Sequence, residues 1–345
     1  MKQRILAILL SLTMMFTLVP TAMAEGEKVA KVGDVEYETL QAAIDAATAG
    51  QTVKLVANTA EDIKISADKD ITLDLGNSKL TNKSGDTITV ALGATLTVTG
   101  NGESADEDGS AGTVDNVTNG KADIVNNGTV ILNGGWYLRS EETGVDSNTS
   151  GGNSYYNILN HGEMTINNDT MVMQETGKYS SLIVNGYYNY YAEGTDSRQK
   201  YVEGINQAAP KLTINDGVFF GGVNTIKNDD GGELIINGGG FGNEEGCAVM
   251  NNNTATIKGG RFIAEGNYVL YSRYINDTVN TGKLTVTNGK FEGNLAQINN
   301  APIAISGGTF TTDPTAYLAE GYMSPKVGDS YKVGLETDAV AQIDD

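Results

Sequence analysis

The sequence contains few of the residues on which many folds and active sites depend. Its 345 residues include one cysteine, one histidine, one tryptophan and five prolines. A single cysteine excludes an intrachain disulfide framework and a zinc site built from cysteines, and a single histidine excludes a metal centre with several histidines. Charged residues make up only 19% of the chain, so the composition is not that of a charge-driven disordered protein.

Positive charge is scarce as well. The chain has 23 Lys and Arg residues against 43 Asp and Glu residues, which gives a formal net charge of −20. Nucleic acids and anionic membrane surfaces are also negative and would repel such a chain. The composition therefore disfavours both as partners.

The first 24 residues have the pattern of a secretory signal peptide. Lys2 and Arg4 give a basic start, residues 5–19 form an apolar run, and Ala22-Met23-Ala24 is a small-x-small cleavage site. The apolar run is too short for a comfortable membrane span. We expect cleavage after Ala24, export to the cell surface or the medium, and no membrane insertion afterwards. An uncleaved anchor helix is the alternative.

Glycine is abundant, with 43 residues, and much of it belongs to a repeated unit. The unit has two apolar residues separated by one residue, followed by a polar residue and glycine. The second apolar residues of successive copies are Leu75, Val98, Leu132, Ile166, Ile214, Ile236, Ile257, Val286 and Ile305. Such alternation predicts short strands with one buried face, and a unit of about twenty residues must stack on its neighbours to bury that face. The expected result is a parallel β-solenoid whose coils lie about 4.8 Å apart.

Two residue types recur at fixed places in the copies. Aromatic residues follow the glycines at Trp136-Tyr137, Phe219-Phe220, Phe241, Phe262, Phe291 and Phe310. Asparagine ends a preceding apolar stretch at Asn126, Asn160, Asn206, Asn228, Asn251 and Asn299. We expect the phenylalanines to stack inside the coil. We expect the asparagines to form an inward ladder at one corner.

These features resemble the right-handed parallel β-helix of pectate-lyase-like proteins. The Asn-ended strand, the short corner and the Gly-Gly-x-Phe return carry the resemblance over most of residues 28–333. Residues 31–76 and 307–322 resemble the N-terminal capping and closing segments of cell-surface β-helix proteins of Gram-positive bacteria. The resemblance implies an all-β, right-handed parallel β-helix, but not an activity, since this fold carries lyases, hydrolases, adhesins and inert stalks.

We therefore expect one β-helix domain with capped ends. The expected parts are a signal peptide at 1–24, an N-terminal cap with a short helix at 25–52, the coil at 53–310, and a C-terminal cap with an acidic tail at 311–345. Insertions are expected near 100–120, 139–153, 174–205 and 266–280.

The largest insertion is rich in tyrosine. It contains Tyr179, Tyr187, Tyr188, Tyr190, Tyr191 and Tyr201, and Tyr268, Tyr271 and Tyr274 follow in the insertion near 266–280. If the insertions leave the coil on one side, their flat rings with polar tips form a surface suited to sugar rings or protein partners. This predicts a non-catalytic, adhesin-like protein that binds carbohydrate or a host or cell-surface ligand. The alternative is that the tyrosines only pack the loops onto the coil.

A few residues could act in acid–base catalysis, but they could also be structural residues of the coil. The resemblance points to Asp229, Asp230, His161 and Arg261, because related enzymes combine carboxylates with a basic residue. His161 directly follows a ladder asparagine, which favours a corner residue. A polysaccharide lyase or glycoside hydrolase acting on acidic polysaccharide is one alternative function, and a purely structural spacer is another.

One acidic cluster is a candidate calcium site. Glu103, Asp106, Glu107 and Asp108 offer carboxylates that could hold Ca²⁺. The alternative is a solvated acidic loop, and no other cofactor is expected.

Overall fold

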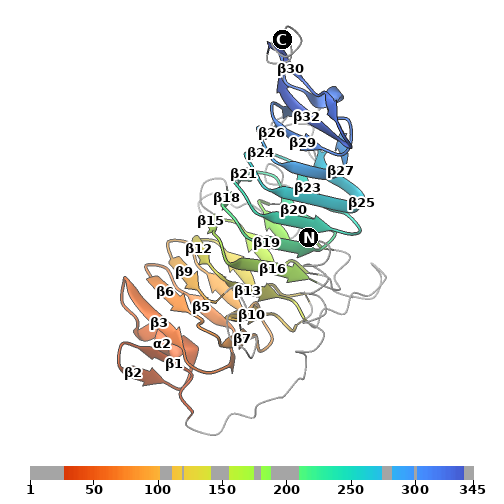
Figure 1. The fold of residues 1–345 in the computed structure, drawn as a ribbon. Helices are drawn as coiled ribbons and strands as arrows, with labels where there is room; N and C mark the ends of the chain where they lie inside the picture. Colours follow the sequence, from red (N-terminus) through yellow and green to blue (C-terminus); the bar gives the residue numbers. More distant parts are fainter. Residues whose placement is uncertain are drawn as a thin grey trace.

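The computed structural model describes residues 27–101, 111–118, 120–140, 155–174, 180–187, 210–273, 282–298 and 301–337. Within these residues the chain winds into a parallel β-helix, with three strands in each coil and each strand beside its equivalent in the next coil (Figure 1). This confirms the predicted all-β parallel β-helix with one short helix near its N-terminal end.

The strands of each coil lie on three faces. The first face contains β3 (Gln51–Leu55), β6 (Asp70–Asp74), β9 (Thr95–Thr99), β12 (Thr129–Asn133), β15 (Glu163–Ile166), β18 (Lys211–Ile214), β21 (Glu233–Ile236), β24 (Thr254–Ile257), β26 (Lys283–Val286) and β28 (Ile303–Ile305). The second contains β4 (Thr59–Ala60), β7 (Lys79–Thr81), β10 (Thr113–Asp115), β13 (Gly135–Leu138), β16 (Thr170–Gln174), β19 (Val218–Gly221), β22 (Gly240–Asn243), β29 (Gly308–Phe310) and the first parts of β25 (Arg261–Ser272) and β27 (Lys290–Gln297). The third contains β5 (Ile63–Ile65), β8 (Ile88–Val90), β11 (Ile124–Asn126), β14 (Ile158–Asn160), β17 (Ile183–Asn185), β20 (Asn224–Asn228), β23 (Cys247–Asn251) and the last parts of β25 and β27.

The register of the first face follows the predicted repeat with one exception. Val98, Leu132, Ile166, Ile214, Ile236, Ile257, Val286 and Ile305 pair in succession, as their alignment in the sequence predicts. At the first copy, however, Val98 pairs with Leu73 and not with Leu75. Leu73 and Leu75 are both fully buried, and a slip of two residues keeps a strand's faces unchanged. The local pattern therefore could not distinguish them.

A column of phenylalanines runs through the interior. Phe219, Phe241, Phe262, Phe291 and Phe310 stack with ring centroids 4.6–4.9 Å apart. This confirms the predicted stack. At the earlier coil Tyr137, not Trp136, continues the inward column, since it is fully buried and in register with Val172.

The asparagine ladder occupies the corner between the third and first faces. The side-chain amides of Asn126, Asn160, Asn185, Asn228 and Asn251 bond in succession at 2.7–2.9 Å, and all five are fully buried. Asn185 fills the place predicted for Asn206, which lies outside the described residues together with Asn299. Ser272 and Gln297 continue the same register in the last coils.

Both ends of the coil are covered. At the N-terminal end lie the antiparallel strands β1 (Ala30–Val32) and β2 (Val35–Tyr37) and the helix α2 (Leu40–Ala46). The Glu61 carboxylate accepts hydrogen bonds from the first two amides of α2, at 2.7 and 3.1 Å. The C-terminal end is closed by the 3₁₀ turn η1 (Thr315–Tyr317) and by antiparallel pairings among β29, β30 (Tyr322–Met323), β31 (Lys326–Val327) and β32 (Ser330–Leu335).

The segments outside the described residues attach at all three corners of the coil. Residues 102–110 separate the first and second faces, and 141–154 and 175–179 separate the second and third. Residues 188–209 and 274–281 separate the third face from the next strand of the first. The attachment points therefore do not share one flank. Residues 266–272 of the insertion expected near 266–280 belong to strand β25.

Candidate functional site

The asparagine-ladder corner brings together three of the four candidate catalytic residues. His161 and Asp229 each follow a ladder asparagine, and Asp230 comes next after Asp229. Arg261 lies elsewhere, at the start of β25 on the second face, where its guanidinium bonds to the Glu292 carboxylate at 2.9 and 2.6 Å. The structure therefore does not assemble the four residues into one site.

His161 is enclosed at this corner. Its ring stacks on that of Tyr187, with centroids 4.1 Å apart, and the Tyr187 hydroxyl donates to the His161 carbonyl at 3.3 Å. His161 is 6% exposed, and burial lowers the pKa of its imidazole to about 4. The imidazole is therefore neutral near pH 7 and has one face covered, as suits a corner residue.

The two aspartates are buried in the same region. Asp229 is 2% exposed, pairs with the Lys227 ammonium at 2.6 Å and accepts from the Asn252 amide at 3.1 Å. Asp230 is 4% exposed, and its carbonyl accepts the Tyr187 backbone N–H at 2.9 Å. Glycoside cleavage needs two carboxylates that face a sugar between them. Asp229 is instead occupied by neighbouring side chains.

A pair of tyrosines lies on the outside of the coil beside these residues. Tyr268 and Tyr271, both in β25, are partly exposed and stack with ring centroids 5.3 Å apart. The Arg273 guanidinium lies over the Tyr271 ring, 5.9 Å from its centroid. The strand is irregular between Ile263 and Leu270, and this irregularity places the two rings on one side.

Polar side chains connect the tyrosine pair to the buried aspartate. Arg273 Nε donates to Asn252 Oδ1 at 3.1 Å, Asn252 Nδ2 donates to Asp229 Oδ1 at 3.1 Å, and Asp229 pairs with Lys227. We call Lys227, Asp229, Asn252, Tyr268, Tyr271 and Arg273 the Tyr271 surface. It combines two partly exposed aromatic rings with a guanidinium that neighbouring side chains hold in place.

Sequence reasoning noticed Tyr268 and Tyr271 but did not select them as site residues. Their spacing of three residues would put them on opposite sides of a regular strand. The hydrogen-bonded chain from Lys227 to Arg273 depends on three different coils. The one sequence signal for this chain of contacts is that Asp229 and Asn252 each directly follow a ladder asparagine.

The predicted ligand-binding tyrosines and calcium ligands are either buried or outside the described residues, so none is seen in the Tyr271 surface. Of the tyrosines in the insertion expected at 174–205, only Tyr187 is described, and it is 1% exposed and stacked on His161. Tyr179, Tyr188, Tyr190, Tyr191 and Tyr201 lie outside the described residues, as do the calcium candidates Glu103, Asp106, Glu107 and Asp108. Among the residues that the structure does describe, no three His, Cys, Asp or Glu side chains are grouped to hold a metal ion.

Comparisons with known proteins assign no family to the chain. No family model matches it, and neither the curated proteins nor the solved structures contain a match. Across the described ranges, no helix has the length and apolar character needed to cross a bilayer.

Proposed function

We propose that this protein is a non-catalytic β-helix that binds carbohydrate, and that the Tyr271 surface is a binding site. The observation that carries the proposal is the stacked pair of Tyr268 and Tyr271, partly exposed and bordered by Arg273. Sugar rings present apolar C–H faces to aromatic rings and hydroxyls to neighbouring polar groups. Arg273, held by Asn252, supplies donors at the edge of the ring.

The arrangement of the catalytic candidates supports a binding role over catalysis. His161 is covered by Tyr187, Asp229 is paired with Lys227, and Arg261 is paired with Glu292 on another face. A general acid or base must reach the group to or from which it transfers a proton. None of these three side chains offers an open, uncommitted group.

The proposal includes export and a wider contact area. The basic start, apolar run and cleavage site of residues 1–24 support release at the cell surface or into the medium. Tyr187 and Arg273, which lie at the corner that carries the Tyr271 surface, are directly followed in the sequence by residues 188–209 and 274–281. The insertion tyrosines Tyr188, Tyr190, Tyr191 and Tyr201 belong to the first of these segments and are proposed as further ligand-binding residues. A host or cell-surface glycan is the proposed ligand.

A glycan array followed by titration tests the proposal. Residues 25–345 are applied to the array, and the strongest neutral or acidic glycans are titrated against the wild type and Tyr271→Ala. We expect the variant to bind up to about tenfold more weakly, since a stacking ring contributes up to about 1.5 kcal/mol. Tyr331→Ala is the matched control, because its ring also has a cation nearby, Lys326 at 5.8 Å from the centroid, but lies in β32 of the C-terminal cap and outside the Tyr271 surface.

Three results would contradict the proposal in different ways. Unchanged affinity in Tyr271→Ala would remove the Tyr271 surface as the site. Release of unsaturated or reducing ends from acidic polysaccharides, tested with and without Ca²⁺, would establish a lyase or hydrolase instead. No binding to any glycan and no cleavage would leave the structural spacer as the function.

A further inference from the structure

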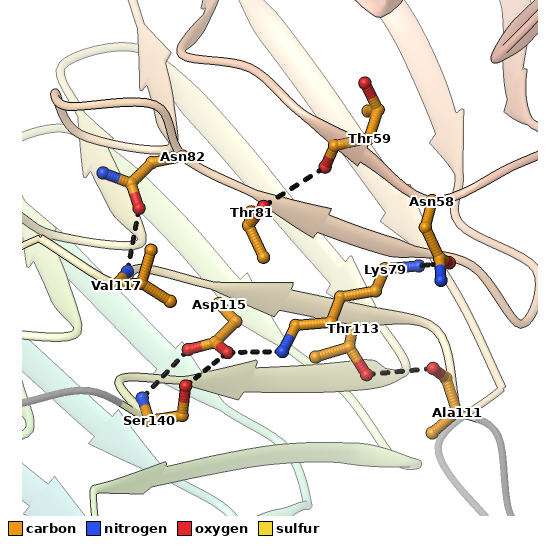
Figure 2. A network of polar contacts seen from close by, with 10 residues as sticks. All are labelled: Asn58, Thr59, Lys79, Thr81, Asn82, Ala111, Thr113, Asp115, Val117 and Ser140. Atoms are coloured by element: carbon orange, nitrogen blue, oxygen red, sulfur yellow. Dashed lines mark hydrogen bonds and ion pairs between the residues drawn. The ribbon is translucent and has the colours of Figure 1, made fainter. Parts of the chain in front are cut away.

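Lys79 and Asp115 meet on neighbouring coils at the N-terminal part of the second face. Lys79 begins β7 and Asp115 ends β10, and the two strands pair in parallel, with Thr81 beside Asp115. The Lys79 ammonium lies 2.6 Å from Asp115 Oδ2 (Figure 2). The Lys79 side chain is 37% exposed, whereas that of Asp115 is 0% exposed.

Other groups hold the Asp115 carboxyl in place. The Ser140 backbone N–H donates to Oδ1 at 2.9 Å, and the Ser140 hydroxyl donates to Oδ2 at 2.6 Å. Figure 2 shows the Lys79 and Ser140 groups converging on the carboxylate. On the other side β10 pairs with β13, so that Thr113 lies beside Trp136 and Asp115 beside Leu138. Trp136 and Leu138 belong to a buried apolar cluster, which keeps water away from the carboxyl.

A second carboxyl group is buried close by. Asp123 is 0% exposed, and its Oδ1 has no hydrogen-bond partner among the described residues, while Asn157 donates to its Oδ2 at 3.4 Å. Burial, and then the negative charge of Asp115, raise the pKa of Asp123 well above its usual value, against the opposing charge of Arg139. The raised pKa favours the uncharged form of Asp123, which adds no second negative charge beside Asp115.

We propose that Lys79 and Asp115 condense to an intramolecular amide that joins the two coils covalently. Proton transfer within the ion pair gives a neutral amine and a neutral carboxyl. The Lys79 nitrogen then attacks Cγ of Asp115, and Ser140 hydrogen-bonds to the oxygens of the tetrahedral intermediate. As the intermediate collapses, its nitrogen loses one proton and the departing hydroxyl gains one, so that one water leaves and no oxidant or reductant is needed.

The cross-link would strengthen a place where the coil is interrupted. The chain between Lys79 and Asp115 contains residues 102–110, which separate β9 from β10. A covalent bridge closes that loop and reduces the entropy of the unfolded chain. This inference concerns the other end of the coil from the Tyr271 surface and does not depend on glycan binding.

Mass spectrometry of purified residues 25–345 tests the proposal directly. We expect an intact mass lower than the sequence mass by about 18 Da, one water, and a proteolytic peptide pair linked through Lys79 and Asp115. Lys79→Arg keeps the charge but should show neither the loss nor the linked pair.

Two controls make the result specific. A succinimide at an Asp-Gly sequence such as Asp216-Gly217 also loses one water, but it would persist in Lys79→Arg and give no linked pair. The pair Lys54–Asp74 is 3.6 Å apart and more exposed on the first face, and it should stay unlinked. Wild-type protein without the linked pair after prolonged incubation at pH 5–7 would overturn the proposal, whatever the variants do.

Discussion

Tyr268 and Tyr271 stack with their ring centroids 5.3 Å apart although they lie three residues apart in one strand. In a regular strand, residues at this spacing point to opposite sides. The register of β25 against β27 shifts twice between Ile263 and Leu270, and this places both rings outside the coil. An irregularity in one strand thus creates the aromatic surface on which the proposed function depends.

The contact between Arg273 and Asn252 predicts that glycan binding needs the guanidinium of Arg273 and not only its positive charge. Arg273→Lys keeps the positive charge but removes the Nε donor that lies 3.1 Å from Asn252 Oδ1. We expect glycan affinity to fall about tenfold, the cost of one charge-assisted hydrogen bond, with the fold unchanged. Calorimetric titration of the best array ligand measures this. Equal affinity in both proteins would show that Arg273 acts only through its charge.

The asparagine ladder predicts that replacing a buried asparagine lowers the free energy of unfolding much more than replacing an exposed one. Asn185 is fully buried and bonds to Asn160, Asn228 and the Glu233 carbonyl. Asn185→Ala leaves these groups unsatisfied, so the free energy of unfolding should fall by about 3 kcal/mol in urea titrations.

Asn215 is the matched control for that prediction. It stands in an outer ladder, bonded to Asn167 and Asn237 at 2.7 Å, but it is exposed to water. Asn215→Ala should change the free energy of unfolding by no more than about 0.5 kcal/mol. Similar losses in the two variants would mean that burial does not set the value of these amide bonds.

The phenylalanine column predicts a graded loss of stability. Phe262 is fully buried and stacks on Phe241 at 4.6 Å and on Phe291 at 4.9 Å. Phe262→Ala should cost about 4 kcal/mol of unfolding free energy, because it leaves a cavity between two rings. Phe262→Leu retains most of the apolar volume and should cost less than half as much. Thermal and urea unfolding compare the variants, and an equal loss in both would argue against close packing of the column.

The burial of His161 predicts that the free energy of unfolding falls as the pH is lowered. Burial lowers the pKa of His161 from 6.5 to about 4, so between these values the unfolded chain binds more protons than the folded one. Stability contributed by His161 is therefore complete above pH 6.5 and is lost as the pH falls toward 4, by about 3 kcal/mol.

The variant His161→Asn isolates this contribution. Asparagine follows the ladder asparagine in two other coils, at Asn127 and Asn252, and it does not titrate. The wild type should lose stability relative to the variant between pH 6.5 and 4, as measured by urea unfolding across that range. A constant difference between the two proteins would show that His161 does not remain neutral in the fold.

Several features of the corners escaped the sequence analysis for identifiable reasons. The ladder place predicted for Asn206 belongs to Asn185, because β17 pairs with β14 and β20. Both asparagines follow an apolar residue, and residues 188–209 separate Asn185 from β18, the next strand of the first face. Likewise, nothing local shows that Arg273, Asn252 and Asp229 are stacked neighbours, since each belongs to a different coil.

The coil, its inward phenylalanines and most of its register could be predicted from the order of the amino acids. These depend on alternation within a few residues, which sets the buried face of a strand, and on the recurrence of that pattern, which requires stacking. Three features depend on the folded chain: which side chains meet at the corners, how β25 bends to pair Tyr268 with Tyr271, and the contact between Lys79 and Asp115. The corner contacts and the contact of Lys79 with Asp115 join residues from different coils. Because insertions of unequal length separate the coils, no local sequence pattern shows which residues become neighbours.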